Sequence, residues 1–210
     1  MNDRIGELLP KNIRIRLASA SPRRRELLSA MGIPFTVSPC DVDEQIGEGT
    51  HPADAVILLS ARKAQAAAAC FGTEDVILSS DTLVEIDGVP LGKPKDEADA
   101  LSMLLRLSGR EHRVHTGLSV AWHGECRTVR DTTRVFMRPF TEEEARAYIA
   151  TGEPADKAGA YAIQGIASAF IEKIDGDYFN VVGLPTCRMF GLLREAFGIE
   201  PEDVICKNNV

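Results

Sequence analysis

The sequence predicts an α/β fold with one mixed sheet flanked by helices. Helical and strand patterns interleave along the chain, which is typical of the α/β class. Several strand pairs are joined by short hairpin turns, which a purely parallel sheet does not contain. The chain has 210 residues, 44% of them hydrophobic, which is enough for one substantial core or two small lobes.

The first half of the chain alternates between short apolar runs, typical of strands, and longer amphipathic segments, typical of helices. Proline near the start and glycine just past the end delimit the longest helix. An Asp-Gly pair predicts a hairpin between LVEI and VPLG. The expected elements are a strand at 13–18, a helix capped by Ser21 with Pro22 first, a strand at 35–39, a helix at 52–71, a strand at 75–80 and a helix at 96–109.

The second half begins with HRVHTGLSVAW and CRTVRDTTRVFMR, which we expect to be long antiparallel strands around a His-Gly turn. TEEEARAYIATG predicts a helix with a Thr-x-x-Glu capping box and a glycine stop. A second Asp-Gly pair predicts a hairpin between AFIEKI and DYFNVVG, and PTCRMFGLLREAFG predicts the last helix. We expect one domain over 1–210, with residues 1–12 and about 199–210 peripheral, the end being a loose tail.

Composition excludes several classes of function. The 24 basic and 31 acidic residues give a net charge of −7, whereas nucleic-acid binding needs a basic surface. No segment approaches the roughly 18 apolar residues of a membrane span, and the first residues lack the apolar core of a signal peptide. The five cysteines are scattered without a Cys-x-x-Cys pair, which favours a reducing cytoplasm over a disulfide framework or zinc site.

The stretch LASASPRRRELL, residues 17–28, places Arg23, Arg24 and Arg25 in the first turn of a helix. The helix dipole already puts positive charge there, so each arginine costs about 0.3–1 kcal/mol at an exposed site. One interpretation is a solvated face. The other is an anion site, because free helix N–H groups and guanidinium forks both bind phosphate.

Two carboxylates follow predicted strands. Asp81 in SSDT comes directly after an apolar run, and ligands of α/β sheets gather beyond the carboxyl ends of strands. It is a candidate metal ligand or general base, or else the cap of a turn. Glu44 in DVDE belongs to an acidic loop that is solvated on local evidence alone. A pair of carboxylates from two strand ends would, however, suit Mg²⁺.

Other polar residues leave two interpretations open. Lys63 in ARKA is either an ordinary surface lysine of its helix or part of a site. Lys93 and Lys95 in GKPKD are either phosphate contacts or solvated loop residues. Gln164 lies in the apolar run IQGIA, where a buried amide needs partners that a nucleobase edge or a backbone group could supply.

Several common motifs are absent from the sequence. It contains no P-loop, no dinucleotide-binding G-x-G-x-x-G and no G-x-S-x-G nucleophile elbow. His112 and His115 fall on opposite faces of a predicted strand, so they do not form a zinc site, and no histidine is expected to be catalytic. The remaining arginine, lysine, carboxylate and amide groups suit metal-assisted attack of water on a polyphosphate.

The motifs LASASPRRRELL, VDE, ARKA, SSDT, GKPKD and AGAYAIQG occur in this order over nearly the whole chain. Together they resemble the Maf family of nucleoside triphosphate pyrophosphatases. The resemblance implies hydrolysis of a nucleoside triphosphate to the monophosphate and pyrophosphate with Mg²⁺ or Mn²⁺. It also implies an α/β fold akin to the inosine triphosphate pyrophosphatases, with a cleft between two lobes, and a homodimer. The form GAYAIQG is similar to the branch that prefers dTTP and UTP, although Ala162 stands where glycine is frequent.

The resemblance also assigns roles residue by residue. It implies Asp81 as the proton acceptor. We add the hypothesis that Glu44 and Asp81 hold the metal ion, directly or through water. Arg25 has no role and is expected to be exposed. The substrate-binding positions that it implies are Ser19, Arg23, Arg24, Lys63, Thr82, Lys93 and Gln164, of which Arg23, Thr82 and Gln164 set specificity.

Two alternatives stay open at this point. One is a pyrophosphatase of the same fold that acts on 7-methyl-GTP or a purine-type nucleotide. The other is a nucleotide-binding regulator of cell division without turnover. The carboxylates Glu44 and Asp81 favour an enzyme, because a protein that only binds a polyphosphate needs cations more than acids.

Overall fold

The computed structural model describes residues 13–47 and 49–205. The expected peripheral residues 1–12 and the last residues, 206–210, lie outside the described part. The elements in chain order are β1 (Ile15–Leu17), α1 (Pro22–Ala30), β2 (Phe35–Val37), α2 (Pro52–Phe71), β3 (Val76–Ile86), β4 (Val89–Leu91), α3 (Glu97–Leu107), β5 (Glu111–Trp122), β6 (Glu125–Met137), α4 (Glu142–Ile149), η1 (Glu153–Asp156), η2 (Ala158–Ala160), η3 (Ile166–Phe170), β7 (Ile171–Asp175), α5 (Tyr178–Val182), α6 (Thr186–Phe197) and α7 (Pro201–Val204).

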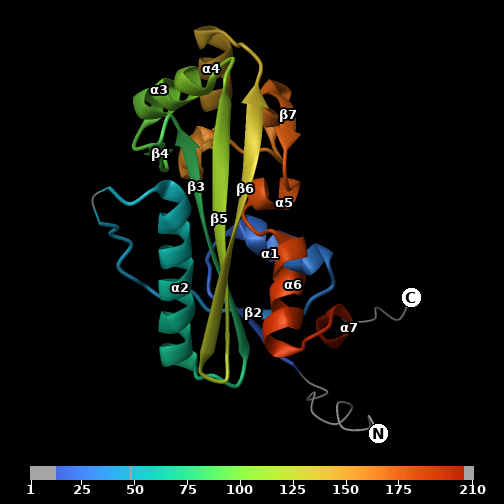
Figure 1. The fold of residues 1–210 in the computed structure, drawn as a ribbon. Coiled ribbons are helices and arrows are strands. Elements are labelled where there is room, and N and C mark those ends of the chain that lie inside the picture. Colours follow the sequence, from blue (N-terminus) through green and yellow to red (C-terminus); the bar gives the residue numbers. More distant parts are fainter. Residues whose placement is uncertain (1–12, 48, 206–210) are drawn as a thin grey trace, which may run out of the picture.

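A single mixed sheet organises the molecule (Figure 1). Its strand order is β2-β1-β3-β5-β6-β7, with β4 paired to the far end of β3. The short strand β1 is parallel to both β2 and β3, and all other pairs are antiparallel. The predicted mixed sheet of an α/β fold is therefore confirmed. The long strands β3, β5 and β6 run through the height of the molecule, with α3 and α4 at one end and α6 and α7 near the other.

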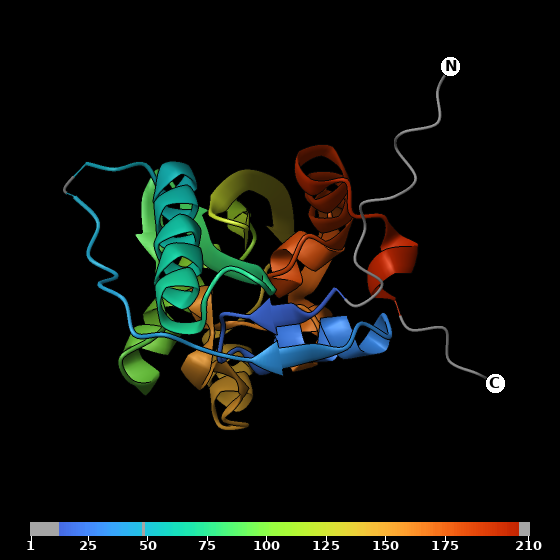
Figure 2. The same ribbon diagram turned by 90° about the horizontal axis from the view of Figure 1, so that it is seen from below.

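Helices cover both faces of the long strands. The helix α2 packs along β3, β5 and β6 on one face, and α5 and α6 contact β5 and β6 on the other (Figure 2). The approach of α2 is close because Gly117 of β5 has no side chain. A Cβ at this position would lie 2.0 Å from the carbonyl oxygen of Val56. The glycine therefore sets the depth at which α2 sits on the sheet.

The outer edge of β3 is interrupted in its middle. Residues 76–78 of β3 pair with β1, and residues 84–86 pair with β4. Between them, the segment 79–83 pairs with β5 on one side, and within the described residues no strand borders it on the other. The gap faces the start of α1, which follows directly after β1. An open strand edge is thus left at the centre of the molecule.

This topology corrects the prediction that the strand starting at residue 75 ends at Ser80, directly before Asp81. The strand β3 continues through Asp81 to Ile86, so Asp81 lies within a strand and not after one. The polar residues that suggested a strand end are accommodated by partners distant in sequence. Ser79 donates a hydrogen bond of 2.5 Å to the carbonyl oxygen of Ser60, and Ser80 donates one of 2.8 Å to that of Gly183.

Two further predictions are wrong. The segment DYFNVVG does not form the second strand of a hairpin but the helix α5. The Asp177 side chain caps it by accepting from the backbone N–H of Phe179, and Gly183 ends it in the left-handed conformation. The expected loose tail begins with the short helix α7, which a reciprocal capping box of Glu200 and Asp203 stabilises and whose Val204 is buried in the core.

Most other elements agree with the sequence-based expectations. The helix α2 has the predicted bounds, and the turns between β3 and β4 and between β5 and β6 have the positive φ angles of tight hairpins. The capping box of α4 is present. The short 3-10 helices η1, η2 and η3 were not expected. No helix in the described ranges is both long and apolar enough to cross a membrane.

Replacing Gly117 with alanine should destabilise the fold. The added methyl group would collide with the backbone of α2, and overpacking of this kind costs about 1–3 kcal/mol or more. Urea unfolding of Gly117→Ala and of Gly191→Ala measures the effect. Gly191 lies in α6 with nothing within 4 Å of an added Cβ, so its alanine variant should be neutral or slightly more stable. Equal unfolding midpoints for the two variants would contradict this account of how α2 packs.

Candidate active site

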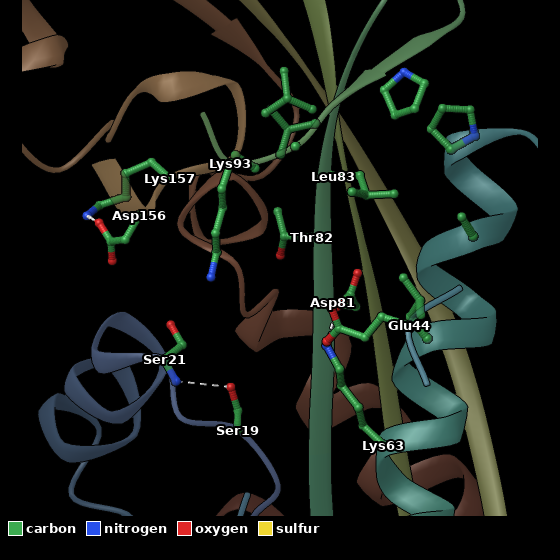
Figure 3. A pocket seen from close by; sticks show the side chains of 18 of the residues that line it. Ser19, Ser21, Glu44, Lys63, Asp81, Thr82, Leu83, Lys93, Asp156 and Lys157 are labelled. Atoms are coloured by element: carbon green, nitrogen blue, oxygen red, sulfur yellow. Dashed lines mark hydrogen bonds and ion pairs between the residues drawn. The ribbon is translucent and has the colours of Figure 1, made fainter. Parts of the chain in front are cut away.

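A cavity of about 1280 Å³ opens at the interrupted edge of β3. Its wall is built by the turn between β1 and α1, the loop before α2, α2 itself, the middle of β3, the loop after β4 and the segment 156–164. Polar side chains from all these segments point toward one another across it (Figure 3). The lining includes every residue to which the sequence analysis gave a catalytic, metal or substrate role: Ser19, Arg23, Arg24, Glu44, Lys63, Asp81, Thr82, Lys93 and Gln164.

Two carboxylates meet at one ammonium group in this cavity. The Nζ atom of Lys63 lies 2.5 Å from Oδ1 of Asp81 and 2.8 Å from Oε1 of Glu44. Asp81 and Lys63 are largely buried, whereas the side chain of Glu44 is 64% exposed. The hydrogen bond from Lys63 is the main cause that lowers the pKa of Glu44, and the charges of Lys63, Lys93 and Arg24 lower it further against the opposing effect of burial.

Helix geometry explains why Lys63 reaches Asp81. Side chains on an α-helix tilt toward its N-terminus, so the long lysine side chain runs back along α2 toward the middle of β3. The bond from Ser79 to the Ser60 carbonyl fixes α2 one turn away from this contact. Lys63 is therefore no ordinary surface lysine but part of the cavity wall.

Arg24 is held by three oxygen acceptors on the opposite side of β3. It donates to the carbonyl of Gly183 at 2.8 Å, to Oγ of Ser19 at 2.9 Å and to Oγ1 of Thr82 at 3.2 Å. Burial is the main cause that lowers the pKa of Arg24 to about 10, which leaves the guanidinium charged at neutral pH. The nearby Asp81 opposes this shift. Arg24 is therefore a positive charge held in place at the N-terminus of α1.

The start of α1 keeps its capacity to bind an anion. Ser21 is the predicted N-cap residue, but its side chain makes no capping hydrogen bond, and its own backbone N–H donates to Oγ of Ser19 at 3.3 Å. The guanidinium of Arg23 lines the cavity and forms no ion pair with any described residue. Arg25 is exposed, as expected, and does not line the cavity.

The far end of the cavity is formed by the segment AYAIQG. Gln164 lies on a turn and is exposed, so its amide does not require the buried partners that an apolar run would have demanded. Behind it, the hydroxyl of Tyr161 bonds to Nε2 of His112 at 2.8 Å. Burial lowers the pKa of His112 to about 4, so this imidazole stays neutral at physiological pH. His115 instead has its Nε2 atom 2.6 Å from Oε2 of Glu85, so the two histidines have different hydrogen-bond partners.

The sequence analysis missed some residues of the cavity. Lys157 and Asp156 line it as an ion pair on the wall opposite α1, near Lys93 (Figure 3). Lys157 is the main cause that lowers the pKa of Asp156, to which Arg23 adds a smaller effect, so Arg23 and this pair share one region. Their position next to AGAYAIQG was the available signal. Lys95, by contrast, does not line the cavity.

The carboxylates of Glu44 and Asp81 fit a single divalent cation whose remaining ligands come from a phosphate group and water. Within the described ranges, no group of three or more histidine, cysteine or acidic side chains could hold a metal. Glu44 and Asp81 nevertheless direct two carboxylate oxygens at one point, which Lys63 now neutralises. Cations such as Mg²⁺ commonly take one or two protein carboxylates and complete their shell with water and substrate phosphate oxygens.

The chain is similar to one protein family and to several known proteins. A family profile described as Maf-like protein matches residues 14–196. The chain is 47% identical over 190 residues to a dTTP/UTP pyrophosphatase of Caldanaerobacter subterraneus subsp. tengcongensis, which covers 90% of this chain and 91% of the relative. It is 48% identical over 190 residues to a dTTP/UTP pyrophosphatase of Geobacter metallireducens, which covers 89% of this chain and 97% of the relative. The solved structure of the Staphylococcus aureus Ham1 protein aligns with 59% of this chain and 71% of its own at 17% identity, with a TM-score of 0.43.

Replacing Lys63 with methionine should raise the pKa of Glu44 toward its ordinary value of 4.5, because the main donor to this carboxylate is lost. The lowered pKa means that the pair stabilises the folded protein above about pH 4.5 and that this contribution disappears as the pH falls through the lower, folded-state value. An NMR titration of the Glu44 carboxyl carbon measures it. Lys95→Met, outside the cavity, is the control, and an unchanged Glu44 titration in Lys63→Met would contradict the assignment.

Proposed function

The chain belongs to the Maf family, and we propose that it hydrolyses dTTP and UTP to the nucleoside monophosphate and pyrophosphate. The relatives named above carry this activity in their names, and they match this chain over most of both lengths. One observation carries the proposal: the carboxylates of Asp81 and Glu44 both contact the ammonium group of Lys63, and the charged guanidinium of Arg24 lies nearby. A cavity that joins acids and cations suits hydrolysis of a polyphosphate better than simple binding of one.

The triphosphate is proposed to lie across the start of α1. Arg23 and Arg24 would bind its oxygens together with the free N–H groups of the helix, which favour an anion. Ser19 and Lys93 reach the same space from the turn before α1 and the loop after β4. The cations that cost stability in an empty site would be neutralised by the substrate.

Asp81 is proposed to accept the proton from the attacking water. The oxygen of this water forms a bond to the α-phosphorus, the bond from the α-phosphorus to the bridging oxygen breaks, and pyrophosphate leaves with the electron pair. Lys63 holds Oδ1 of Asp81 in place at 2.5 Å, and the neighbouring cations stabilise the negative charge that develops on the leaving group. A divalent cation held by Glu44 and Asp81 would supply further neutralisation of the phosphate oxygens.

The nucleoside is proposed to lie toward the segment AYAIQG. The amide of Gln164 offers both a donor and an acceptor to a base edge, and Thr82 lines the same cavity while it accepts from Arg24. Lys157 is a further candidate contact at this side of the cavity. The cytoplasmic location predicted from the cysteine pattern stays a prediction, as does the homodimer that the family implies. The absence of membrane and nucleic-acid partners is likewise a prediction.

Asp81→Asn should lower turnover about 100-fold or more while leaving the fold intact, because the amide cannot accept the proton. The assay incubates the protein with dTTP, UTP, CTP, 7-methyl-GTP, ITP and purine triphosphates and measures monophosphate and pyrophosphate separately. Asp87→Asn, at the exposed turn after β3, is the matched control. Near-normal activity of Asp81→Asn would overturn the assigned role, and release of orthophosphate from wild type would overturn the reaction.

Removal of divalent cations with EDTA should abolish turnover, and Mg²⁺ or Mn²⁺ should restore it. Glu44→Gln should raise the cation concentration needed for half-maximal activity, because one of two carboxylate ligands is lost. Glu74→Gln changes an exposed acid outside the cavity and should leave this concentration unchanged. Full activity in EDTA would contradict the proposed use of a metal.

A further inference from the structure

The turn that carries Gln164 is supported from behind by a single carboxylate. Glu153, in η1, accepts a hydrogen bond from the backbone N–H of Ile166 at 2.9 Å and from that of Ala167 at 3.4 Å. These are the first N–H groups of η3, which no residue within the helix can satisfy. Glu153 therefore fixes the chain immediately after Gln164.

Gly165 allows the carboxylate to come this close. A Cβ at Gly165 would lie 2.2 Å from Oε2 of Glu153, and its φ angle of −108° is one that any residue adopts. The glycine next to Gln164 is therefore required by the contact with Glu153 and not by the shape of the backbone. The carboxylate lies directly beneath the turn.

Tyr148 links this support to the other end of the turn. Its hydroxyl donates to Oε1 of Glu153 at 2.8 Å and accepts from the backbone N–H of Ala162 at 3.3 Å. Tyr148 belongs to α4, is buried, and packs edge-on against Phe170 with ring centroids 5.6 Å apart. The two ends of the segment 162–167 are thus anchored to one rigid pair of side chains.

Gln164 itself has no such anchor. It is exposed on the cavity side, and no hydrogen bond to its amide is found within the described part of the chain. Its direction therefore depends on the backbone on either side of it. Charged hydrogen bonds to this backbone fix the position from which the Gln164 side chain extends, before any ligand binds.

We propose that Glu153 is a positioning residue that acts through the Gly165 turn to hold the Gln164 amide against the nucleobase, so that it sets affinity for the base without touching the substrate. This inference rests on the proposed function, since it assigns Gln164 to the base. It predicts that loss of the carboxylate weakens substrate binding more than it slows the chemical step, because Asp81 and Glu44 lie on other elements.

A double-mutant cycle tests the proposal. Glu153→Gln keeps the length of the side chain but replaces one acceptor oxygen by an amide N–H₂, which cannot accept from the backbone. It should raise the KM for UTP about tenfold, the effect of one lost charged hydrogen bond, with kcat changed less than twofold. In a Gln164→Ala background, the same substitution should change KM less than twofold. A tenfold effect in both backgrounds, a loss of kcat alone or an unchanged KM would overturn the proposal.

Two further variants separate positioning from general instability. Glu142→Gln removes an exposed acid of α4 that pairs with Arg146, and it should leave KM unchanged. Gly165→Ala disturbs the same contact, because the added methyl group would collide with the Glu153 carboxylate. It should raise the KM as Glu153→Gln does. This second variant keeps the test decisive should Glu153→Gln not fold. If the wild-type protein hydrolyses no UTP, the proposed function fails by itself. The double-mutant cycle is then measured as the Kd for UTP by calorimetry. Additive losses of binding free energy in the double mutant would overturn the positioning role.

Discussion

The difference in length between β1 and β3 is the constraint on which the site depends. β1 ends at Leu17, opposite Leu78, whereas β3 continues to Ile86. The chain that leaves β1 turns at once into α1, so the start of this helix faces the uncovered middle of β3. A longer β1 would cover Asp81 and carry the arginines away from it. The meeting of acids and cations thus follows from where one short strand stops.

This arrangement also decides how the charges are distributed. Lys63 is neutralised by two carboxylates, and Arg24 is surrounded by oxygen acceptors that do not carry full charge. Arg23 and Lys93 line the same space and make no ion pair among the described residues. The fold therefore pairs some of its cations with acceptors of the protein and leaves others available to an anion, although the chain has a net charge of −7.

The parts of the fold that were predictable from the sequence are those with local causes. Pro52 and Gly72 delimit α2 through local backbone geometry, and the Asp-Gly turn between β3 and β4 needs no distant partner. The length of β3 was not predictable in this way, because its polar residues are satisfied by Ser60 and Gly183, which only the folded chain brings near. The same holds for the site. The sequence motifs identify the residues, but Lys63 can pair with Glu44 and Asp81 only when α2 packs on the sheet.

The open edge also explains why two adjacent residues of β3 can serve one ligand. Successive side chains of a strand point to opposite faces, so Asp81 turns toward α2 and Lys63, while Thr82 turns toward Arg24. In the interior of a sheet, the next strand would cover the edge, and no single ligand could contact side chains on both faces. At an uncovered edge, both can be reached from the side. In the proposed function, a ligand along this edge would contact the acid on one face and the arginine network on the other, so that a strand interior, and not a strand end, forms the centre of the candidate site.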